Sequence, residues 1–224
     1  MTRTKAPMVA ALRLVVAIAG YASTTQGVSL AGAQTAAATQ ASPSSAAGTA
    51  HRGGPGHTAA DAAFMTGMIA HHAQAVLMAG WAPSHGASPA VQALCERIVV
   101  GQQDEIALMQ RWLGEWHEPV PEADASHDMM PGMGHMLMPG MLTAEQLMQL
   151  DRATGPEFDR LFLTFMIRHH QGALTMIAEL IGTPGAARDD NVFKLVSDMN
   201  ADQTIEIERM TTMLAAVPAA GQGP

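Results

Sequence analysis

The chain has 224 residues, with 12 Lys and Arg against 20 Asp and Glu, and a formal net charge of −8 at pH 7. This acidic balance leaves no basic stripe of the kind that binds nucleic acid, which argues against nucleic acid as a partner. The length suffices for one sizeable core, and the single cysteine, Cys95, excludes an intramolecular disulfide.

Residues 1–33 have the pattern of a secretory signal peptide. Arg3 and Lys5 precede an apolar run over residues 14–22, and residues 31–33 read Ala-Gly-Ala, a small-residue cleavage site. The run is shorter than a membrane-spanning helix. We therefore expect a periplasmic or secreted protein with no stable membrane span after cleavage, an uncleaved anchor being the alternative. Loss of Arg3, Lys5 and Arg13 would leave 9 basic and 20 acidic residues, a formal net charge of −11.

Residues 34–58 are dominated by Ala, Ser, Thr, Gly and Pro, without apolar periodicity. Such a composition predicts a flexible leader between the signal peptide and the folded domain. His51 and His57 lie in this leader, and we expect both to be solvated.

Two segments 98 residues apart repeat one pattern. Residues 61–78 read DAAFMTGMIAHHAQAVLM and residues 159–176 read DRLFLTFMIRHHQGALTM. They share the template D-x2-F-x3-M-I-x-H-H-x2-A-x2-M, which fixes eight of eighteen positions. A repeat of this quality predicts a chain built from two similar units.

The apolar periodicity and the breaker residues predict an all-α fold. The second and last helices share the pattern Q-x2-E-I-x2-M-x2-[WM]-L, from Gln102 and from Gln203. Short turns favour antiparallel neighbours, so two repeated helical hairpins should form a four-helix bundle over residues 59–217. The predicted helices cover residues 59–81, 88–116, 143–150, 155–181 and 189–217.

Each copy of the repeat places a thioether beside two adjacent imidazoles. In a helix, Met68 neighbours His71 and His72, and Met166 stands likewise before the second histidine pair. Adjacent residues differ by about 100° around the axis, so one histidine of each pair should face the interior, and the other a neighbouring position or the surface. Imidazole and thioether together favour soft metal ions. The alternative is a Met stripe that only packs the core, with hydrogen-bonded histidines.

The segment joining the hairpins is rich in Met and His. Residues 127–141 read HDMMPGMGHMLMPGM, in which Pro and Gly prevent a continuous helix. We interpret it as an exposed loop that binds copper or silver through thioether sulfur. The alternative is a loop that buries its Met side chains against the bundle. The complete set of candidate metal ligands is His71, His72, His169, His170, Met65, Met68, Met78, Met166, Met176, His127, Met129, Met130, Met133, His135, Met136, Met138 and Met141.

Three stretches resemble the exported domain of unknown function 305 (DUF305) family: MPGM-x-T at residues 138–143, G-x-E-F-D-R-L-F-L-x-x-M-I-x-H-H-Q-G-A-L at residues 155–174, and F-M-x-x-M-I-x-H-H in the first copy. The resemblance covers about residues 59–214. It implies a ferritin-like four-helix bundle, and it implies kinship with periplasmic copper or silver binders. Position by position, it supports the four repeat histidines and their Met neighbours as metal ligands.

The leading hypothesis is an exported protein that binds Cu(I) or Ag(I) for buffering, trafficking or resistance, with other exported metal-handling proteins as further partners. One alternative is a metal-free helical module that acts through protein contacts. Another is a ferritin-like di-iron oxidase, which needs Glu-x-x-His pairs. No Glu stands three residues before a repeat histidine, so we expect no enzymatic activity.

Overall fold

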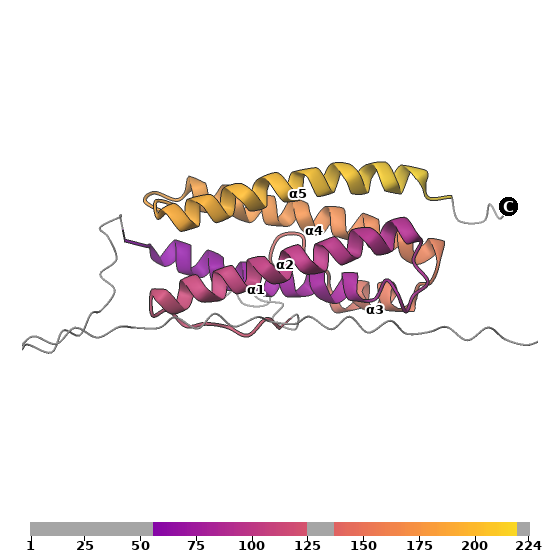
Figure 1. Cartoon of the computed structure of the whole chain (residues 1–224), viewed down its shortest axis with the longest axis horizontal. Helices are drawn as coiled ribbons and strands as arrows, with labels where there is room; N and C mark the ends of the chain where they lie inside the picture. Colours follow the sequence, from indigo (N-terminus) through magenta and orange to yellow (C-terminus); the bar gives the residue numbers. More distant parts are fainter. Residues whose placement is uncertain (1–55, 125–136, 219–224) are drawn as a thin grey trace, which may run out of the picture. The chain divides into compact units, whose positions relative to one another are not determined.

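The computed structural model describes residues 56–124 and 137–218 and is helical throughout these ranges apart from turns and connections (Figure 1). The all-α prediction is confirmed, and the predicted helix limits agree to within two residues. The signal peptide and all of the leader before residue 56 lie outside the described residues. The helices are α1 (Ala59–Gly80), α2 (Pro89–Glu115), α3 (Ala144–Arg152), α4 (Pro156–Gly182) and α5 (Asp190–Ala216).

Short polar side chains fix where the helices begin. Thr58 caps α1 and forms a reciprocal capping box with Asp61, and Thr143 does the same for α3 with Gln146. Ser88 caps α2 and is followed by proline at the first helical position, where a missing N–H does no harm. These local signals are the reason that the sequence predicts the helix starts so closely.

The four long helices form a bundle from two hairpins. α1 packs on α2, α4 packs on α5, and α1 meets α4 at the interface between the hairpins. α2 and α5 face each other across a groove whose hollows are lined by residues of both helices. The short α3 packs against α4. None of the helices in the described ranges combines the length and the apolarity that a membrane span requires.

The connection between the hairpins crosses the length of the bundle. The chain leaving α2 lies beside the start of α1, since Glu118 pairs with His57 at 2.7 Å. The start of α4 lies at the other end, where the Gly155 N–H donates to the carbonyl of His85 at 2.8 Å. One long crossover between two hairpins is the connectivity of ferritin-like bundles.

The repeated aspartate clasps the two hairpins together. Asp61 of α1 accepts a 2.7 Å hydrogen bond from the Ala187 N–H, in the turn between α4 and α5. Asp159 of α4 accepts from the Ser88 N–H, in the turn between α1 and α2, at 3.1 and 3.2 Å. Both carboxylates are buried. Each hairpin therefore begins with an aspartate that fixes the turn of the other.

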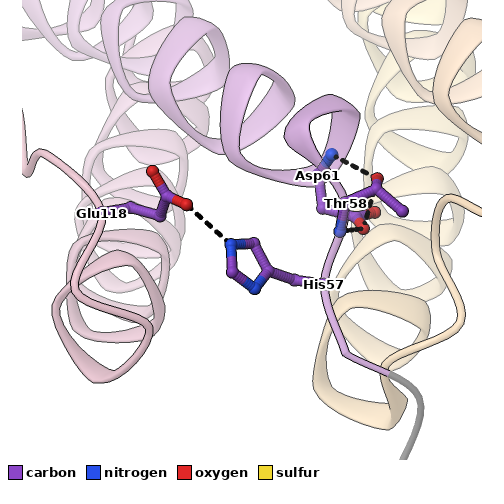
Figure 2. Close-up of polar contacts among 4 residues, drawn as sticks. All are labelled: His57, Thr58, Asp61 and Glu118. Atoms are coloured by element: carbon purple, nitrogen blue, oxygen red, sulfur yellow. Dashed lines mark hydrogen bonds and ion pairs between the residues drawn. The ribbon is translucent and has the colours of Figure 1, made fainter.

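His57 is not solvated, so the expectation for this residue is wrong. Figure 2 shows its ring reaching Glu118, with the capping pair Thr58 and Asp61 next to it. The imidazole also lies 4.6 Å from the Trp116 ring, centroid to centroid. The cause is the aromatic surface at the end of α2, which covers the residue that leads into the α1 cap. The other leader histidine, His51, lies outside the described residues.

Buried apolar side chains form two clusters separated by a polar layer. The first cluster contains Met68 of α1 and Met176 of α4, and the second contains Met78 of α1 and Met166 of α4. On every long helix, buried polar residues interrupt the apolar ones between the two clusters. We call these residues the polar layer. Its members are His71, His72, Gln74, Gln102, His169, His170 and Gln203.

Candidate metal site

The inner histidines of the polar layer stack at the interface between the hairpins. The rings of His71 from α1 and His169 from α4 lie 3.8 Å apart, centroid to centroid, with 36° between their planes. Both side chains are completely buried. The two residues occupy the same position of the repeat, so the hairpins meet through identical groups.

The hydrogen bonds of the inner pair leave three ring nitrogens without a partner. Nε2 of His71 lies 3.0 Å from the carbonyl oxygen of Pro139. A carbonyl only accepts, so this nitrogen carries the proton and Nδ1 holds a lone pair, for which the structure shows no partner. In His169 neither ring nitrogen has a hydrogen-bond partner. Buried polar atoms are rarely left in this condition without a ligand or another role.

Burial keeps the inner pair uncharged. It lowers the pKa of His71 to about 3, and repulsion from His72 lowers it further in the same direction. Burial also lowers the pKa of His169 well below its usual value, with the adjacent His71 as the next cause. Both imidazoles are therefore neutral at pH 7, which is the form that coordinates a metal ion.

The outer histidines are held by carboxylates from the neighbouring helices. Nε2 of His72 lies 2.7 Å from Glu105 Oε2 of α2, and Nε2 of His170 lies 2.7 Å from Glu206 Oε2 of α5. A carboxylate accepts, so Nε2 carries the proton in both residues, and Nδ1 remains without a partner. Carboxylates of this kind fix the tautomer and orientation of metal-ligating histidines. Both outer residues thus serve a neighbouring helix, and neither reaches the surface.

Thioethers stand on both sides of the polar layer. Met65, Met68, Met78 and Met166 are fully buried, and Met176 is nearly so. Because Met68 precedes His71 by three residues, and Met166 precedes His169 by three, each inner histidine has a Met neighbour on its own helix. These side chains pack the core, and their role as soft sulfur donors stays a prediction.

Met138 and Met141 are in the core rather than in an exposed loop. For these two residues the exposed position is wrong and the alternative, a loop that buries its Met side chains, is confirmed, while their role as metal ligands stays a prediction. They are 2% and 4% exposed and belong to the cluster that contains Met68. A Cβ placed on Gly67 would lie 3.3 Å from Met138 Sδ and 3.6 Å from Met176 Cε. The rest of the segment lies outside the described residues: His127, Met129, Met130, Met133, His135 and Met136.

Two glycines bring this segment into the bundle. Gly140 has φ +78°, and a Cβ there would lie 2.6 Å from the carbonyl oxygen of Arg168. A Cβ on Gly172 of α4 would lie 2.0 Å from the carbonyl oxygen of Pro139. Only glycine at both positions allows a contact this close, and the contact places the Pro139 carbonyl on His71.

Gln74 fixes the next residue of the same segment. Its amide accepts from the Leu142 N–H at 2.8 Å and donates to the Leu142 carbonyl at 3.1 Å. Gln74 and Gly172 occupy equivalent positions of the repeat. The two copies therefore differ where the crossover segment passes between them.

The residues that the sequence interpretation missed are the partners on α2 and α5. Glu105 and Glu206 hold the outer histidines, and Gln102 and Gln203 complete the polar layer. Their signal was the repeated Q-x2-E pattern, which indicated matching helices with a carboxylate on each but did not show that these carboxylates hold the histidines.

Thiolate and all-carboxylate ligation find no support here. Burial, and then the charge of Asp159, raise the pKa of the Cys95 thiol to about 12, so this buried side chain is a protonated thiol at pH 7. Across the part of the chain that the structure describes, no three His, Cys, Asp or Glu side chains converge as a metal-binding group.

Comparison with known proteins identifies the family. The sequence pattern described as "Domain of unknown function (DUF305)" matches residues 61–214. A DUF305 protein from Streptomyces coelicolor is 28% identical, with a TM-score of 0.62 over 74% of this chain and 98% of that one. CopM in its Cu(II)-bound form is 32% identical, with a TM-score of 0.55 over 70% of this chain and 96% of that one.

CopM in its Cu(I)-bound form is similar at 28% identity and a TM-score of 0.53, over 70% of this chain and 96% of that one. Its structure is also known with silver bound. No curated protein matches this sequence. Since the family pattern spans nearly all of the helical bundle, the chain belongs to the DUF305 family.

Proposed function

We propose that this protein is an exported, non-enzymatic binding protein for Cu(I) or Ag(I), which buffers the metal, carries it to other exported proteins or confers resistance to it. The observation that carries the proposal is His169, a completely buried imidazole with no partner on either ring nitrogen. It stacks on His71, a second neutral imidazole.

The chemistry of the surrounding side chains selects the metal. A neutral imidazole offers a lone pair without competition from protons, and thioether sulfur prefers soft, monovalent copper or silver. The inner histidines and their neighbours Met68 and Met166 supply both donor types from α1 and α4. The outer pair, oriented by Glu105 and Glu206, adds two more ring nitrogens.

The relatives support the same proposal. CopM, at 27–32% identity, has been seen with Cu(I), Cu(II) and silver. The Streptomyces relative is described as a candidate secreted protein, in keeping with the signal-peptide pattern of residues 1–33. In this proposal the metal is cargo, so the site must both take it up and release it.

A competition titration tests the proposal. Cu(I) affinity of the full-length chain would be measured against a chromophoric chelator, under reducing conditions at pH 7. His169→Leu, which keeps the apolar contacts and removes the ring nitrogens, should weaken Cu(I) binding at least tenfold. His85→Gln alters a histidine in the α1–α2 turn, outside the polar layer, and should leave affinity unchanged. Equal affinity in His169→Leu and the parent protein would show that the inner histidines are structural.

A further inference from the structure

The groove between α2 and α5 contains a cavity of about 350 Å³ that the soft-metal proposal does not use. Its wall includes Gln102 and Glu105 from α2, and Asp202, Gln203 and Glu206 from α5. All of these offer oxygen atoms, and no sulfur lines the cavity. Oxygen donors select a different class of metal ion from the one that His and Met favour.

The glutamines of this wall have amide groups that nothing in the protein satisfies. Gln203 is 2% exposed and neither its Oε1 nor its Nε2 has a partner, while Gln102 is 4% exposed and its Oε1 has none. Burying an amide without a hydrogen bond is unfavourable. Two such groups from equivalent positions on facing helices point to a ligand that they share.

Three carboxylates gather at the same place. Glu105 and Glu206 are only 16% and 23% exposed, and each uses one oxygen, Oε2, for the outer histidine beside it. Burial raises the pKa of Asp202, and the charges of Glu105 and Glu206 raise it further. The carboxylates are thus close enough to repel one another, which a cation between them would relieve.

The basic residues of the cavity stand at its other end. Arg209 follows Asp202 by seven residues on α5, about 10 Å along the helix axis, although it follows Glu206 by only three. Arg97 lies near Arg209 on the antiparallel α2. The causes that raise the Asp202 pKa are burial and then the acidic groups Glu105, Glu206 and Asp198. In the cavity wall the three carboxylates outnumber the two arginines.

We propose that this end of the groove binds one hard divalent cation, of the Mg²⁺, Mn²⁺ or Ca²⁺ class, as a partly hydrated ion. Carboxylate oxygens of Glu105, Asp202 and Glu206 and amide oxygens of Gln102 and Gln203 hold it, in part through its water ligands. Within the described ranges no three acidic or histidine side chains are placed to coordinate one ion directly. The ion therefore keeps water ligands, as Mg²⁺ commonly does. At about 30 Å³ for each water, the cavity has room for a hydrated ion.

At this site the outer histidines orient the carboxylates and do not bind the ion themselves. By donating to Glu105 and Glu206 they hold the two carboxylates in place, as hydrogen-bonded groups behind metal ligands generally do. The soft site and the groove site then lie on opposite sides of the same two His–Glu pairs. This inference does not depend on the soft-metal proposal, because it rests on oxygen donors only.

Mn²⁺ is the probe for the test, because free and bound Mn²⁺ differ in their electron paramagnetic resonance signal. The full-length chain, stripped with a chelator, should take up one Mn²⁺ per chain in a saturable titration. Asp202→Asn should weaken this binding at least tenfold. Asp104→Asn removes the same charge from an exposed position of α2 beside Glu105, outside the cavity wall, and should change the affinity less than twofold.

A second variant separates binding from folding. Gln203→Leu removes the unpartnered amide, so it should raise the thermal midpoint of the metal-free protein while weakening Mn²⁺ binding at least fivefold. Silver added in one equivalent should leave bound Mn²⁺ in place. The proposal is overturned if the parent shows no saturable Mn²⁺ binding, if Asp202→Asn and Asp104→Asn behave alike, or if silver displaces the Mn²⁺. The first two outcomes do not depend on whether the chain binds a soft metal ion.

Discussion

The buried His71 should make the stability of this protein strongly dependent on pH. Its pKa is about 3 in the folded chain against an ordinary value of 6.5. In the unfolded chain the ring takes up a proton below pH 6.5, whereas in the folded chain it resists until about pH 3. The stabilisation from the neutral ring is therefore complete above pH 7 and is lost as the pH falls from about 6.5 to about 3.

The size of the effect at pH 5 follows from the unfolded value. With a pKa of 6.5 unfolded and about 3 folded, His71 alone lowers the free energy of unfolding by about 2 kcal/mol between pH 7.5 and pH 5. The figure hardly changes if the folded value is one unit higher, because the folded ring is still neutral at pH 5. The lowered pKa of His169 acts in the same direction.

Replacing His71 with Gln isolates this contribution. Gln can still donate to the Pro139 carbonyl but cannot titrate, so the variant escapes the loss that the parent suffers. Urea unfolding of chelator-treated protein at pH 7.5 and pH 5 gives the difference in stability between parent and variant. Between pH 7.5 and pH 5, the free energy of unfolding of the parent should fall by about 2 kcal/mol more than that of His71→Gln.

A second variant serves as the control for core damage. Met68→Leu alters the same core without a titrating group, so its difference from the parent should be the same at both pH values. If the parent and His71→Gln also differ by the same free energy at both values, within about 0.5 kcal/mol, the ring is not held neutral by burial, and the argument for a ready ligand at His71 fails.

Three further predictions concern the Asp61 clasp, the close packing at Gly172 and the Met-rich loop. Asp61→Ala should lower the free energy of unfolding, measured in urea, by about 2–4 kcal/mol, because it removes buried hydrogen bonds of the carboxylate to the helix cap and to the other hairpin. The control is Asp198→Ala on the surface, which should leave the free energy of unfolding nearly unchanged. Gly172→Ala should lower the free energy of unfolding by about 3 kcal/mol or more, since its Cβ would lie 2.0 Å from the backbone of the crossover segment. The control is Gly101→Ala, which has open space around it and should raise the free energy of unfolding by up to about 1 kcal/mol in the same assay. Four Met residues of the joining segment lie outside the described ranges: Met129, Met130, Met133 and Met136. Replacing all four with Leu should reduce the number of Cu(I) ions bound per chain and leave the helical circular-dichroism signal unchanged. If the number of bound ions does not change, these residues are not metal ligands.

The helices could be predicted because their signals are local. A Thr or Ser cap, a proline at the first helical position and an apolar period of 3.6 residues act within one or two turns. The repeat added the hairpin plan, since each copy had to bury the same face. The clasp formed by Asp61 and Asp159 could not be predicted, although the repeat marked both residues. Their acceptor role depends on turns of the opposite hairpin, which lie 126 and 71 residues away along the chain.

Only part of the candidate metal site could be predicted from the sequence, for a related reason. The spacing placed thioethers beside histidines, but it could not show which histidine faces the other hairpin. That depends on how α1 meets α4, and the structure answers with the stack of His71 on His169. The error for Met138 and Met141 has a steric origin: a Pro-Gly segment reads as an exposed turn unless one knows that Gly172 gives it a place on α4.

Duplication itself explains why the polar layer is short of hydrogen bonds. Where two copies of a unit meet across their interface, each group near its centre faces its own counterpart, as His71 faces His169. Gln102 and Gln203, from equivalent positions, line one cavity in the same way. Stacked rings offer each other no donor or acceptor in line, so their nitrogens remain unpartnered.

A layer of this kind lowers the stability of the metal-free protein, and a bound ion should restore what is missing. His169→Leu should therefore raise the urea midpoint of the metal-free chain, because it removes two ring nitrogens that have no hydrogen-bond partner. Burying each such group destabilises a protein by roughly 1–3 kcal/mol. For the parent, Ag(I) at a free concentration of 100 times the dissociation constant should add about 2.7 kcal/mol. The variant should gain far less from silver. If His169→Leu is instead less stable without metal and gains as much from silver as the parent, His169 packs the core and the ion binds elsewhere.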